Sequence, residues 1–232
     1  MESKVKVLSV RVILQVIFFV VLLPFLPLLI SRAWGWWEGW VYGVLGLGSF
    51  IISRSLAARK TPDILAERSK FMHHQDAQTW DKKIIPVAGV IGIVIAVVAG
   101  MDKLWGWTAP FPLVWRVLGL VMVTAGYAFS SYALIENRFF SGMVRLQTDR
   151  GHYVISSGPY RWVRHPGYAG ALIAYLFVPV LLNSWWAFIP TLITIGLYVV
   201  RTSLEDRFLQ ENLEGYRAYA ANVKYRLLPG IW

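Results

Sequence analysis

Apolar residues gather into six runs along the chain, and polar residues or turn formers separate each run from the next. The runs cover residues 10–30, 36–53, 84–101, 112–135, 168–182 and 185–200. A helix needs about 20 apolar residues to cross a bilayer, so the first four runs predict transmembrane helices. The last two runs are shorter, and a helix of about fifteen residues reaches only about 22 Å. Because only Asn183-Ser184 separates them, they predict a short antiparallel helical hairpin.

A second pattern follows the hairpin and predicts an amphipathic helix near the C-terminus. Apolar side chains recur there at steps of three and four: Leu209, Leu213, Tyr216, Ala220 and Val223. Leu228-Pro229-Gly230 is a stop signal for this helix. Together the patterns predict an all-α fold, a polytopic membrane helical bundle of about five to six transmembrane segments whose last two form the hairpin. We expect one membrane domain over residues 1–232, with four transmembrane helices in residues 1–135.

Local signals refine the first two helices and the polar segment after them. Pro24 and Pro27 should bend the outer half of the first helix. Tryptophans at the start of the second helix are typical of an aromatic belt at a membrane interface: Trp34, Trp36, Trp37 and Trp40. The polar residues 54–83 should lie on the membrane surface or cover a site. They include His73-His74, but adjacent residues on a helix or strand do not face one another, which disfavours a metal site.

Composition supports the membrane class and excludes some chemistry. The 232 residues are 56% hydrophobic and only 16% charged, and that apolar share exceeds the usual value for soluble domains. The chain contains no cysteine, which excludes disulfides, thiolate metal sites and cysteine nucleophiles. We expect the net charge of +10 to reflect loops that face anionic lipid rather than binding of nucleic acid.

The distribution of lysine and arginine predicts the orientation in the membrane. Seven of these residues lie in the segment 54–83, five in the segment 138–164 and five from residue 201 onward. The connections expected on the other side carry only three: Arg32, Lys103 and Arg116. By the positive-inside rule, both termini and the long polar segments should be cytoplasmic. The first apolar run is too long for the core of a signal peptide and lacks a good cleavage site, so we expect it to remain as a helix.

The segment Gly158–Tyr168, with the sequence GPYRWVRHPGY, combines turn signals with residues that can bind an anion. Its opening glycine and proline predict a turn. Pro166 favours the first turn of a helix and holds His165 in an extended conformation just before it. The N-terminus of that helix, together with Arg161 and Arg164, suits a carboxylate or a phosphate. We therefore expect an anion-binding corner at the membrane surface, with two aromatic residues close by: Tyr160 and Tyr168.

Arg201 and Glu205 follow the last apolar run and lie four residues apart, which places them on one face of a helix. One interpretation is an ordinary ion pair within the helix. Against it, arginine before glutamate is the less favourable order, and charges directly after an apolar hairpin need a reason. In the alternative, Glu205 holds a cationic group and Arg201 holds a carboxylate through a bidentate contact. Both interpretations stay open at this point, and no cluster of metal ligands or dinucleotide-binding glycine motif is evident.

The run GPYRWVRHPGYAG, followed by a short hairpin and the pattern R-x-x-x-E-D, resembles the isoprenylcysteine carboxyl methyltransferase family. This broader group of membrane methyltransferases also includes phospholipid N-methyltransferases. The resemblance covers residues 147–232 and is only architectural over the first half. It implies S-adenosylmethionine as the cofactor and residues 136–232 as the cofactor-binding catalytic region. It also implies a lipophilic substrate that arrives from the bilayer, and a prokaryotic inner membrane as the compartment.

Carried over position by position, the resemblance implies roles for individual residues. Arg201 would hold the carboxylate of the substrate. The implied cofactor contacts are Gln147, His152, Tyr153, Val154, Ile155, Tyr160, His165, Pro166, Gly167, Tyr168 and Glu205. The chain departs from the family at Asp206, where a second glutamate is frequent, and at Leu213-Glu214-Gly215, where an aromatic residue and a glycine are usual. The second departure concerns the packing of the last helix.

The activity implied by the resemblance is transfer of a methyl group to a carboxylate of a lipophilic substrate. Three alternatives stay open: methylation of an amine or a phospholipid nitrogen, an NADPH-dependent membrane reductase of sterol type, and a scaffold or transporter without a cofactor. Arg201 would repel a cationic substrate, which disfavours an amine. The sequence names neither the methyl acceptor nor the oligomeric state.

Overall fold

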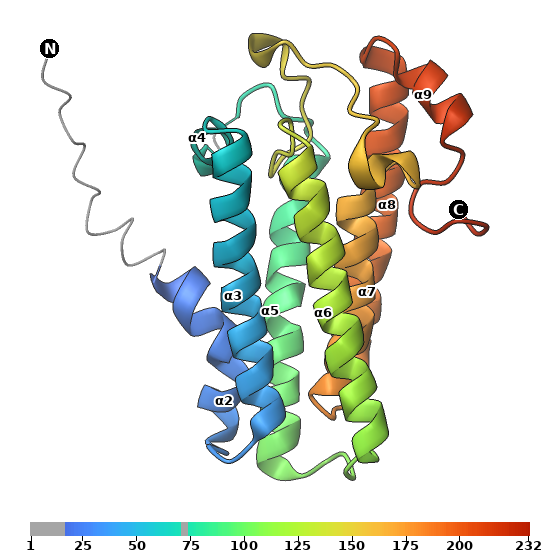
Figure 1. Ribbon diagram of the computed structural model, residues 1–232. Helices are drawn as coiled ribbons and strands as arrows, with labels where there is room; N and C mark the ends of the chain where they lie inside the picture. Colours follow the sequence, from blue (N-terminus) through green and yellow to red (C-terminus); the bar gives the residue numbers. More distant parts are fainter. Residues whose placement is uncertain (1–16, 71–73) are drawn as a thin grey trace, which may run out of the picture.

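The computed structural model describes residues 17–70 and 74–232 and is a bundle of helices that run up and down side by side (Figure 1). Four helices in the described residues are long and apolar enough to cross a membrane: α3 (Trp37–Lys60), α5 (Asp81–Trp105), α6 (Leu113–Glu136) and α8 (Phe188–Asn212). A shorter apolar helix, α7 (Pro166–Leu181), packs against α6 and α8. No β-strand occurs in the described ranges, so the predicted all-α polytopic membrane bundle is confirmed.

The first apolar run forms short helical pieces instead of one regular helix. The described part consists of a π-helical piece, a 3-10 turn and an α-helix: η1 (Ile17–Leu22), η2 (Leu23–Phe25) and α2 (Leu26–Ser31). The helix changes type next to Pro24 and Pro27, because proline lacks the N–H that a regular helix needs. The two prolines therefore interrupt the helix where a bend was expected. Residues 10–16 of this run lie outside the described residues.

Glycines let α6 and α7 approach until their backbones touch. A Cβ atom added at Gly126 would lie 2.6 Å from the carbonyl oxygen of Gly170, and one added at Gly119 would lie 2.6 Å from the amide nitrogen of Leu181. Helices in a membrane gain stability from such close packing, because lipid is as apolar as their side chains. The contact holds α7 in a fixed position against α6 along its whole length.

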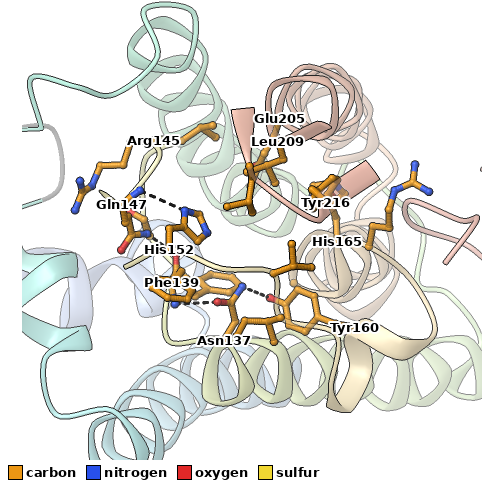
Figure 2. A pocket seen from close by; sticks show the side chains of 18 of the residues that line it. Asn137, Phe139, Arg145, Gln147, His152, Tyr160, His165, Glu205, Leu209 and Tyr216 are labelled. Carbon is orange, nitrogen blue, oxygen red and sulfur yellow. Dashed lines mark hydrogen bonds between the residues drawn. The ribbon is translucent and has the colours of Figure 1, made fainter. Parts of the chain in front are cut away.

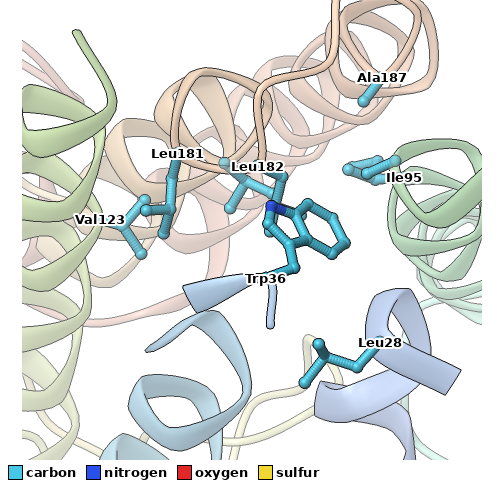
Figure 3. Packing of buried hydrophobic residues seen from close by; sticks show 9 residues of the cluster. Leu28, Trp36, Ile95, Val123, Leu181, Leu182 and Ala187 are labelled. Atoms are coloured by element: carbon cyan, nitrogen blue, oxygen red, sulfur yellow. The ribbon is translucent and has the colours of Figure 1, made fainter. Parts of the chain in front are cut away.

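A cluster of buried apolar residues, drawn in Figure 3, packs α2 and the start of α3 against α5, α6 and the connection between α7 and α8. Trp36 is only 4% exposed and belongs to this cluster together with Leu28 and Leu182, so its assignment to an interfacial belt was wrong. Trp34 and Trp40 are 59% and 44% exposed, as a belt at a membrane interface requires. Further exposed tryptophans lie near the same end of the bundle: Trp105, Trp107, Trp185 and Trp186.

Asn183 and Ser184 form the turn between α7 and α8, as predicted. Asn183 has a positive φ of 56°, and the Ser184 hydroxyl donates a hydrogen bond of 2.5 Å to Asp102 at the end of α5. The prediction of two short helices was right only for α7, which has 16 residues. Helix α8 has 25 residues and continues beyond the apolar run into the charged one. Charged residues form helices as readily as apolar ones do, so the end of an apolar run does not end the helix.

The expected C-terminal amphipathic helix is divided into two parts. Helix α8 ends at Asn212 and α9 covers Tyr216–Asn222. Gly215, between them, has a φ of 78°, which only glycine adopts freely and which interrupts the helix. The apolar face was identified correctly, since its residues pack in one cluster with Tyr160 and Tyr219: Leu209, Leu213, Tyr216, Ala220 and Val223.

The segments between the helices differ in length at the two ends of the bundle. The polar segment 54–83 is only partly a loop, because α3 runs to Lys60, α5 begins at Asp81 and the short helix α4 covers Ile64–Ser69. The loop between α6 and α7 contains two 3-10 turns: η3 (Thr148–Arg150) and η4 (Gly158–Arg161). Turn η4 confirms the predicted turn at Gly158, which has a φ of 55°.

Candidate functional site

A pocket opens at the end of the bundle that carries the long loops (Figure 2). It holds about 790 Å³ of space free of atoms, counting its open mouth. Its walls come from the loop between α6 and α7, the start of α7, the C-terminal part of α8, and α9. Its concave shape and its mixture of apolar and polar walls are typical of a site for a small molecule or a cofactor.

The residues singled out from the sequence meet in this pocket. Of the residues to which the family resemblance assigns roles, all except Pro166 line it: Gln147, His152, Tyr153, Val154, Ile155, Tyr160, His165, Gly167, Tyr168, Arg201 and Glu205. Pro166 is buried and opens α7, so it shapes the pocket without lining it. Sequence reasoning missed other residues of the wall, among them Asn137, Phe140 and Arg145. Gly167 has a packing role as well, because a Cβ atom there would lie 2.5 Å from the ring of Phe140.

The start of α7 and the end of α8 place a carboxylate in the pocket. His165 precedes α7 in a non-helical conformation (φ −125°), as predicted from Pro166. The ring of Tyr168 stacks on that of His165, with 5.8 Å between the ring centroids. The Tyr168 hydroxyl donates a hydrogen bond of 2.5 Å to Glu205. Glu205 is only half-buried, so its carboxylate keeps acceptor capacity for a ligand.

Arg201 lies one helical turn before Glu205 but is not paired with it. Its Nε and Nη2 atoms donate to the two carboxylate oxygens of Asp81, at 2.7 and 3.0 Å. Arg201 and Asp81 are both buried, and the guanidinium also lies over the ring of Tyr168, 5.0 Å from its centroid. The bidentate edge expected to hold a ligand is therefore occupied by Asp81. Within the described part of the chain, Nη1 of Arg201 makes no hydrogen bond and is left for a ligand.

Asp206 forms an ion pair with Arg164, one of the two arginines that were expected to bind an anion. It is fully buried, and the Nε and Nη2 atoms of Arg164 donate to its two oxygens at 2.7 and 3.0 Å. The Nη1 atom of Arg164 donates to the carbonyl groups of residues 223 and 224. The expectation that Arg164 attracts an anion was wrong, because its donors are taken inside the protein. Arg161, the other arginine of the corner, is exposed.

Further partners make Asp206 the junction of the C-terminal region. It accepts hydrogen bonds from Arg226 (2.9 Å), Gln210 (2.8 Å) and Tyr216 (3.1 Å), and the Nε2 atom of His165 lies 3.3 Å away. One carboxylate thus joins the start of α7 to α8, α9 and the C-terminal tail. The departure from the family pattern at Leu213-Glu214-Gly215 is compatible with a well-packed last helix, since Leu213, Tyr216 and Tyr219 are buried in one cluster.

Gln147 and His152 shape the wall opposite α8, as Figure 2 shows. Gln147 is 1% exposed, and its Nε2 atom donates to the carbonyl oxygen of Phe139 at 2.7 Å. Its backbone N–H donates to Nδ1 of His152 at 3.2 Å, which leaves Nε2 of the ring to carry the proton. The ring of His152 packs on that of Phe139, with the centroids 4.5 Å apart.

The electrostatics of His152 predict a dependence of stability on pH. Burial, and then the charges of Arg145 and Arg150, lower the pKa of His152 from 6.5 to about 4. Because the unfolded chain binds this proton more readily, we expect stability to be constant above pH 6.5 and to fall between pH 6.5 and about 4. Thermal unfolding across this range would measure the effect. In His152→Asn, whose side-chain oxygen can replace Nδ1 as acceptor, the fall should be smaller, and an unchanged profile would contradict the assignment to His152.

The extended segment from Tyr153 to Ile155 offers main-chain groups to a ligand. In the described structure none of the N–H and C=O groups of these residues makes a backbone hydrogen bond. Because these residues line the pocket, a ligand there can pair with their main-chain donors and acceptors. Tyr160, at the far end of this wall, accepts a hydrogen bond from Asn137 at 3.0 Å and is only 7% exposed.

A cluster of charges around the buried side chains of Arg145 and Glu67 fastens the segment before α5 to the loop that carries the pocket wall. The guanidinium of Arg145 donates to carboxylates of Glu67 (3.0 Å), Asp76 (2.8 Å) and Asp149 (2.9 Å). His74 lies 3.2 Å from Glu67 in the same cluster. The polar segment thus packs against the loop that carries the pocket wall. None of its described residues lines the pocket, so its expected role as a cover of the site stays a prediction. Among residues 17–70 and 74–232 no histidine, aspartate and glutamate side chains are grouped to hold a metal ion, and His73 lies outside these ranges.

A pocket with apolar and polar walls, built mainly by the C-terminal half of a helical bundle long enough to cross a membrane, defines an integral membrane protein with a candidate binding site at one end. Residues 116–211, which contain most of this pocket, match the model of the isoprenylcysteine carboxyl methyltransferase (ICMT) family. The match confirms the resemblance seen in the sequence and supports membership of this family. A family of methyltransferases implies a methyl donor.

Curated plant proteins show the same similarity. The chain is 33% identical over 109 residues to a "Probable protein-S-isoprenylcysteine O-methyltransferase" of Oryza sativa subsp. indica. The aligned region covers 46% of this chain and 57% of that protein. It is 28% identical over 127 residues to "Protein-S-isoprenylcysteine O-methyltransferase A" of Arabidopsis thaliana, which covers 53% and 60% respectively. The chain thus matches less than two thirds of the length of these relatives.

Proposed function

We propose that this chain is an integral membrane methyltransferase that uses S-adenosylmethionine to methylate a carboxylate on a lipophilic substrate. The observation that carries the proposal is the pocket itself. It brings a carboxylate, Glu205, and a guanidinium, Arg201, together on one face of α8, beside the first turn of α7 and the segment 152–155. The family match and the names of the relatives support this reaction.

The chemistry of the pocket fits this cofactor. Glu205 can bind a cationic ammonium group, since its carboxylate is directed into the pocket and is bonded only to the Tyr168 hydroxyl among the described residues. The free main-chain groups of residues 153–155 can pair with the edge of a heterocyclic base. Tyr160 and Tyr216 add aromatic surface. When bound, S-adenosylmethionine would supply a methyl group on a positively charged sulfur.

A carboxylate acceptor needs no general base in this pocket. Carboxylic acids have pKa values near 4, so the acceptor is already ionised at about pH 7. The protein has to orient it and exclude water. Arg201 can do the first through Nη1, whose N–H donors suit a carboxylate and find no acceptor on a cationic amine. The pocket lies where α7 and α8 leave the apolar region, which suits an acceptor that is held in the membrane by an apolar tail.

The proposal also includes the orientation of the chain in the membrane. The three regions rich in lysine and arginine, residues 54–83, 138–164 and the part beyond 201, lie at the pocket end of the bundle (Figure 1). The short connections at the other end carry three basic residues. By the positive-inside rule the pocket opens to the cytoplasm, where S-adenosylmethionine is made available. A prokaryotic inner membrane is the compartment that the sequence resemblance implies.

Transfer of a labelled methyl group tests the proposed reaction. The purified chain in lipid vesicles would be given methyl-labelled S-adenosylmethionine with N-acetyl-S-farnesylcysteine, palmitic acid or phosphatidylethanolamine. We expect label in a methyl ester, which mild base releases as methanol. Label that resists base would identify an N-methyl product and contradict carboxylate methylation, and stabilisation by NADPH without methyl transfer would favour the reductase.

Replacing Glu205 by glutamine tests the cofactor contact. The change removes a charged hydrogen-bond acceptor while keeping the shape of the side chain, and we expect affinity for S-adenosylmethionine to fall by about 1–3 kcal/mol. Calorimetric titration with S-adenosylmethionine and with S-adenosylhomocysteine would measure it. Glu211→Gln, two turns further along α8 on an exposed surface, is the control and should bind normally. Equal affinities in the two variants would exclude the contact.

A further inference from the structure

The ion pair between Asp81 and Arg201 indicates a role for Asp81, a residue with no role assigned so far. This inference rests on the proposed function. We propose that Asp81 is the positioning residue of the reaction: it holds the guanidinium of Arg201 in the one orientation that presents Nη1 to the carboxylate of the acceptor. Asp81 is the first residue of α5, far from Arg201 in the sequence, and its side chain is fully buried.

The two oxygens of the Asp81 carboxylate hold the guanidinium of Arg201 in one orientation. Oδ1 accepts from Nε of Arg201 at 2.7 Å, and Oδ2 accepts from Nη2 at 3.0 Å. Oδ2 also accepts from the backbone N–H of Val144 at 2.7 Å, so the carboxylate is itself held in place. Nη2 makes a further hydrogen bond of 3.2 Å to the carbonyl oxygen of Gly142. A paired fork of this kind permits little rotation of the arginine.

The donors that remain define where a ligand can bind. A guanidinium has five N–H donors. Asp81 and Gly142 take three of them, one on Nε and two on Nη2. The ring of Tyr168 covers one face of the guanidinium, 5.0 Å from its centre. The two donors of Nη1 are the ones left, and Arg201 lines the pocket.

The negative charge of Asp81 lets an experiment distinguish orientation of the acceptor from electrostatic attraction of the acceptor. Asp81 offsets the positive charge of Arg201, so the pair as a whole carries little net charge and attracts an anion weakly, but Nη1 holds that anion in a defined place. Without the Asp81 charge, the pocket would attract an anionic acceptor more strongly, but the guanidinium would be free to turn. A misplacement of about 1 Å can lower a rate by about 100-fold. Loss of Asp81 should therefore lower kcat while KM for the acceptor stays the same or falls.

A second buried aspartate on the same helix gives a matched control. Asp102 lies at the other end of α5, is 2% exposed, and accepts hydrogen bonds from Thr108 and Ser184. Replacing it by asparagine disturbs a buried polar cluster of similar size, far from the pocket. Any general loss of folded protein should appear in Asp102→Asn as well as in Asp81→Asn.

The experiment compares Asp81→Asn, Asp102→Asn and the unaltered chain in lipid vesicles with N-acetyl-S-farnesylcysteine and S-adenosylmethionine. Rates are expressed per cofactor-binding site, counted by titration with S-adenosylhomocysteine. For Asp81→Asn we expect kcat to fall at least about tenfold, no rise in KM for the acceptor, and cofactor affinity within about twofold of normal. For Asp102→Asn we expect normal kcat and KM per site.

The other possible results would contradict either the role of Asp81 or the proposed function. A normal kcat in Asp81→Asn, or an equal loss in both variants, overturns the role of Asp81. So does a rise in the acceptor KM at constant kcat, since that would indicate binding rather than orientation. If Asp81→Asn yields no cofactor-binding protein, Asp81→Glu decides: it keeps the charge but moves it by one methylene, and a normal kcat would overturn the proposal. An unaltered chain that methylates no carboxylate contradicts the proposed function and this inference with it.

Discussion

Replacing Asp206 by alanine is expected to destabilise the protein by about 3–5 kcal/mol and to abolish cofactor binding. The carboxylate is fully buried, and its removal leaves the guanidinium of Arg164 without a counter-charge. Breaking a buried ion pair on one side costs this much because the remaining charge stays out of water. Asp206 also joins the segment of His165 to α9, so the pocket wall should separate from α8. Thermal unfolding and calorimetric titration with S-adenosylhomocysteine would measure both effects.

An exposed ion pair one residue further along gives the control. Arg207 donates to Glu211 at 2.9 Å on the surface of α8, where ion pairs contribute little. Arg207→Ala should therefore unfold almost as the unaltered chain does. If Asp206→Ala were no less stable than Arg207→Ala, the junction described here would have no energetic role.

Replacing Arg201 by alanine is expected to lower methyl transfer to a carboxylate acceptor by about 100-fold or more, because in the proposed function Arg201 is the group that orients the acceptor. Affinity for S-adenosylmethionine should change little, since Glu205 and the segment 153–155 are untouched. The variant should also lose stability, because Asp81 would remain buried without its partner. Transfer of labelled methyl groups, counted per cofactor-binding site, would measure the first effect, and thermal unfolding would measure the second.

A double variant separates these two effects of Arg201. In Arg201→Ala combined with Asp81→Asn the buried negative charge is absent, so much of the lost stability should return. Methyl transfer should not return, since the orienting group is still missing. Recovery of activity together with stability would mean that Arg201 only supports the fold, and the substrate role would have to be abandoned.

Local sequence signals were sufficient for the parts of the site that depend on the backbone. Pro166 and Gly158 impose conformations on their neighbours by sterics alone, so the turn and the start of α7 follow from the sequence. The spacing of Arg201 and Glu205 likewise fixes them on one helical face. Helix α8 was predicted too short because the boundary was drawn where hydrophobicity ends, whereas a helix continues until a residue such as Gly215 interrupts it.

The pairing of charges could not be predicted in the same way. Asp81 stands at the beginning of an apolar helix, where an acidic residue is ordinary, and nothing near it in the sequence indicates a partner on α8. Asp206 is adjacent to Glu205, yet one carboxylate is buried among arginines and the other lines the pocket. Arg164 was assigned to a bound anion because its partner, Asp206, lies 42 residues away in the sequence. Which arginine meets which aspartate is a property of the packed helices.

The unequal lengths of α7 and α8 determine how deep the pocket lies. The two helices are joined by a tight turn at the far end, and α7 has 16 residues against 25 in α8. At about 1.5 Å per residue, α7 begins roughly 13 Å short of the level at which α8 ends. The floor of the pocket is therefore sunk below the rim formed by the longer helices. A molecule anchored by its tail can present its head group there without being lifted out of the lipid, and a water-soluble acid of similar shape would gain no such advantage.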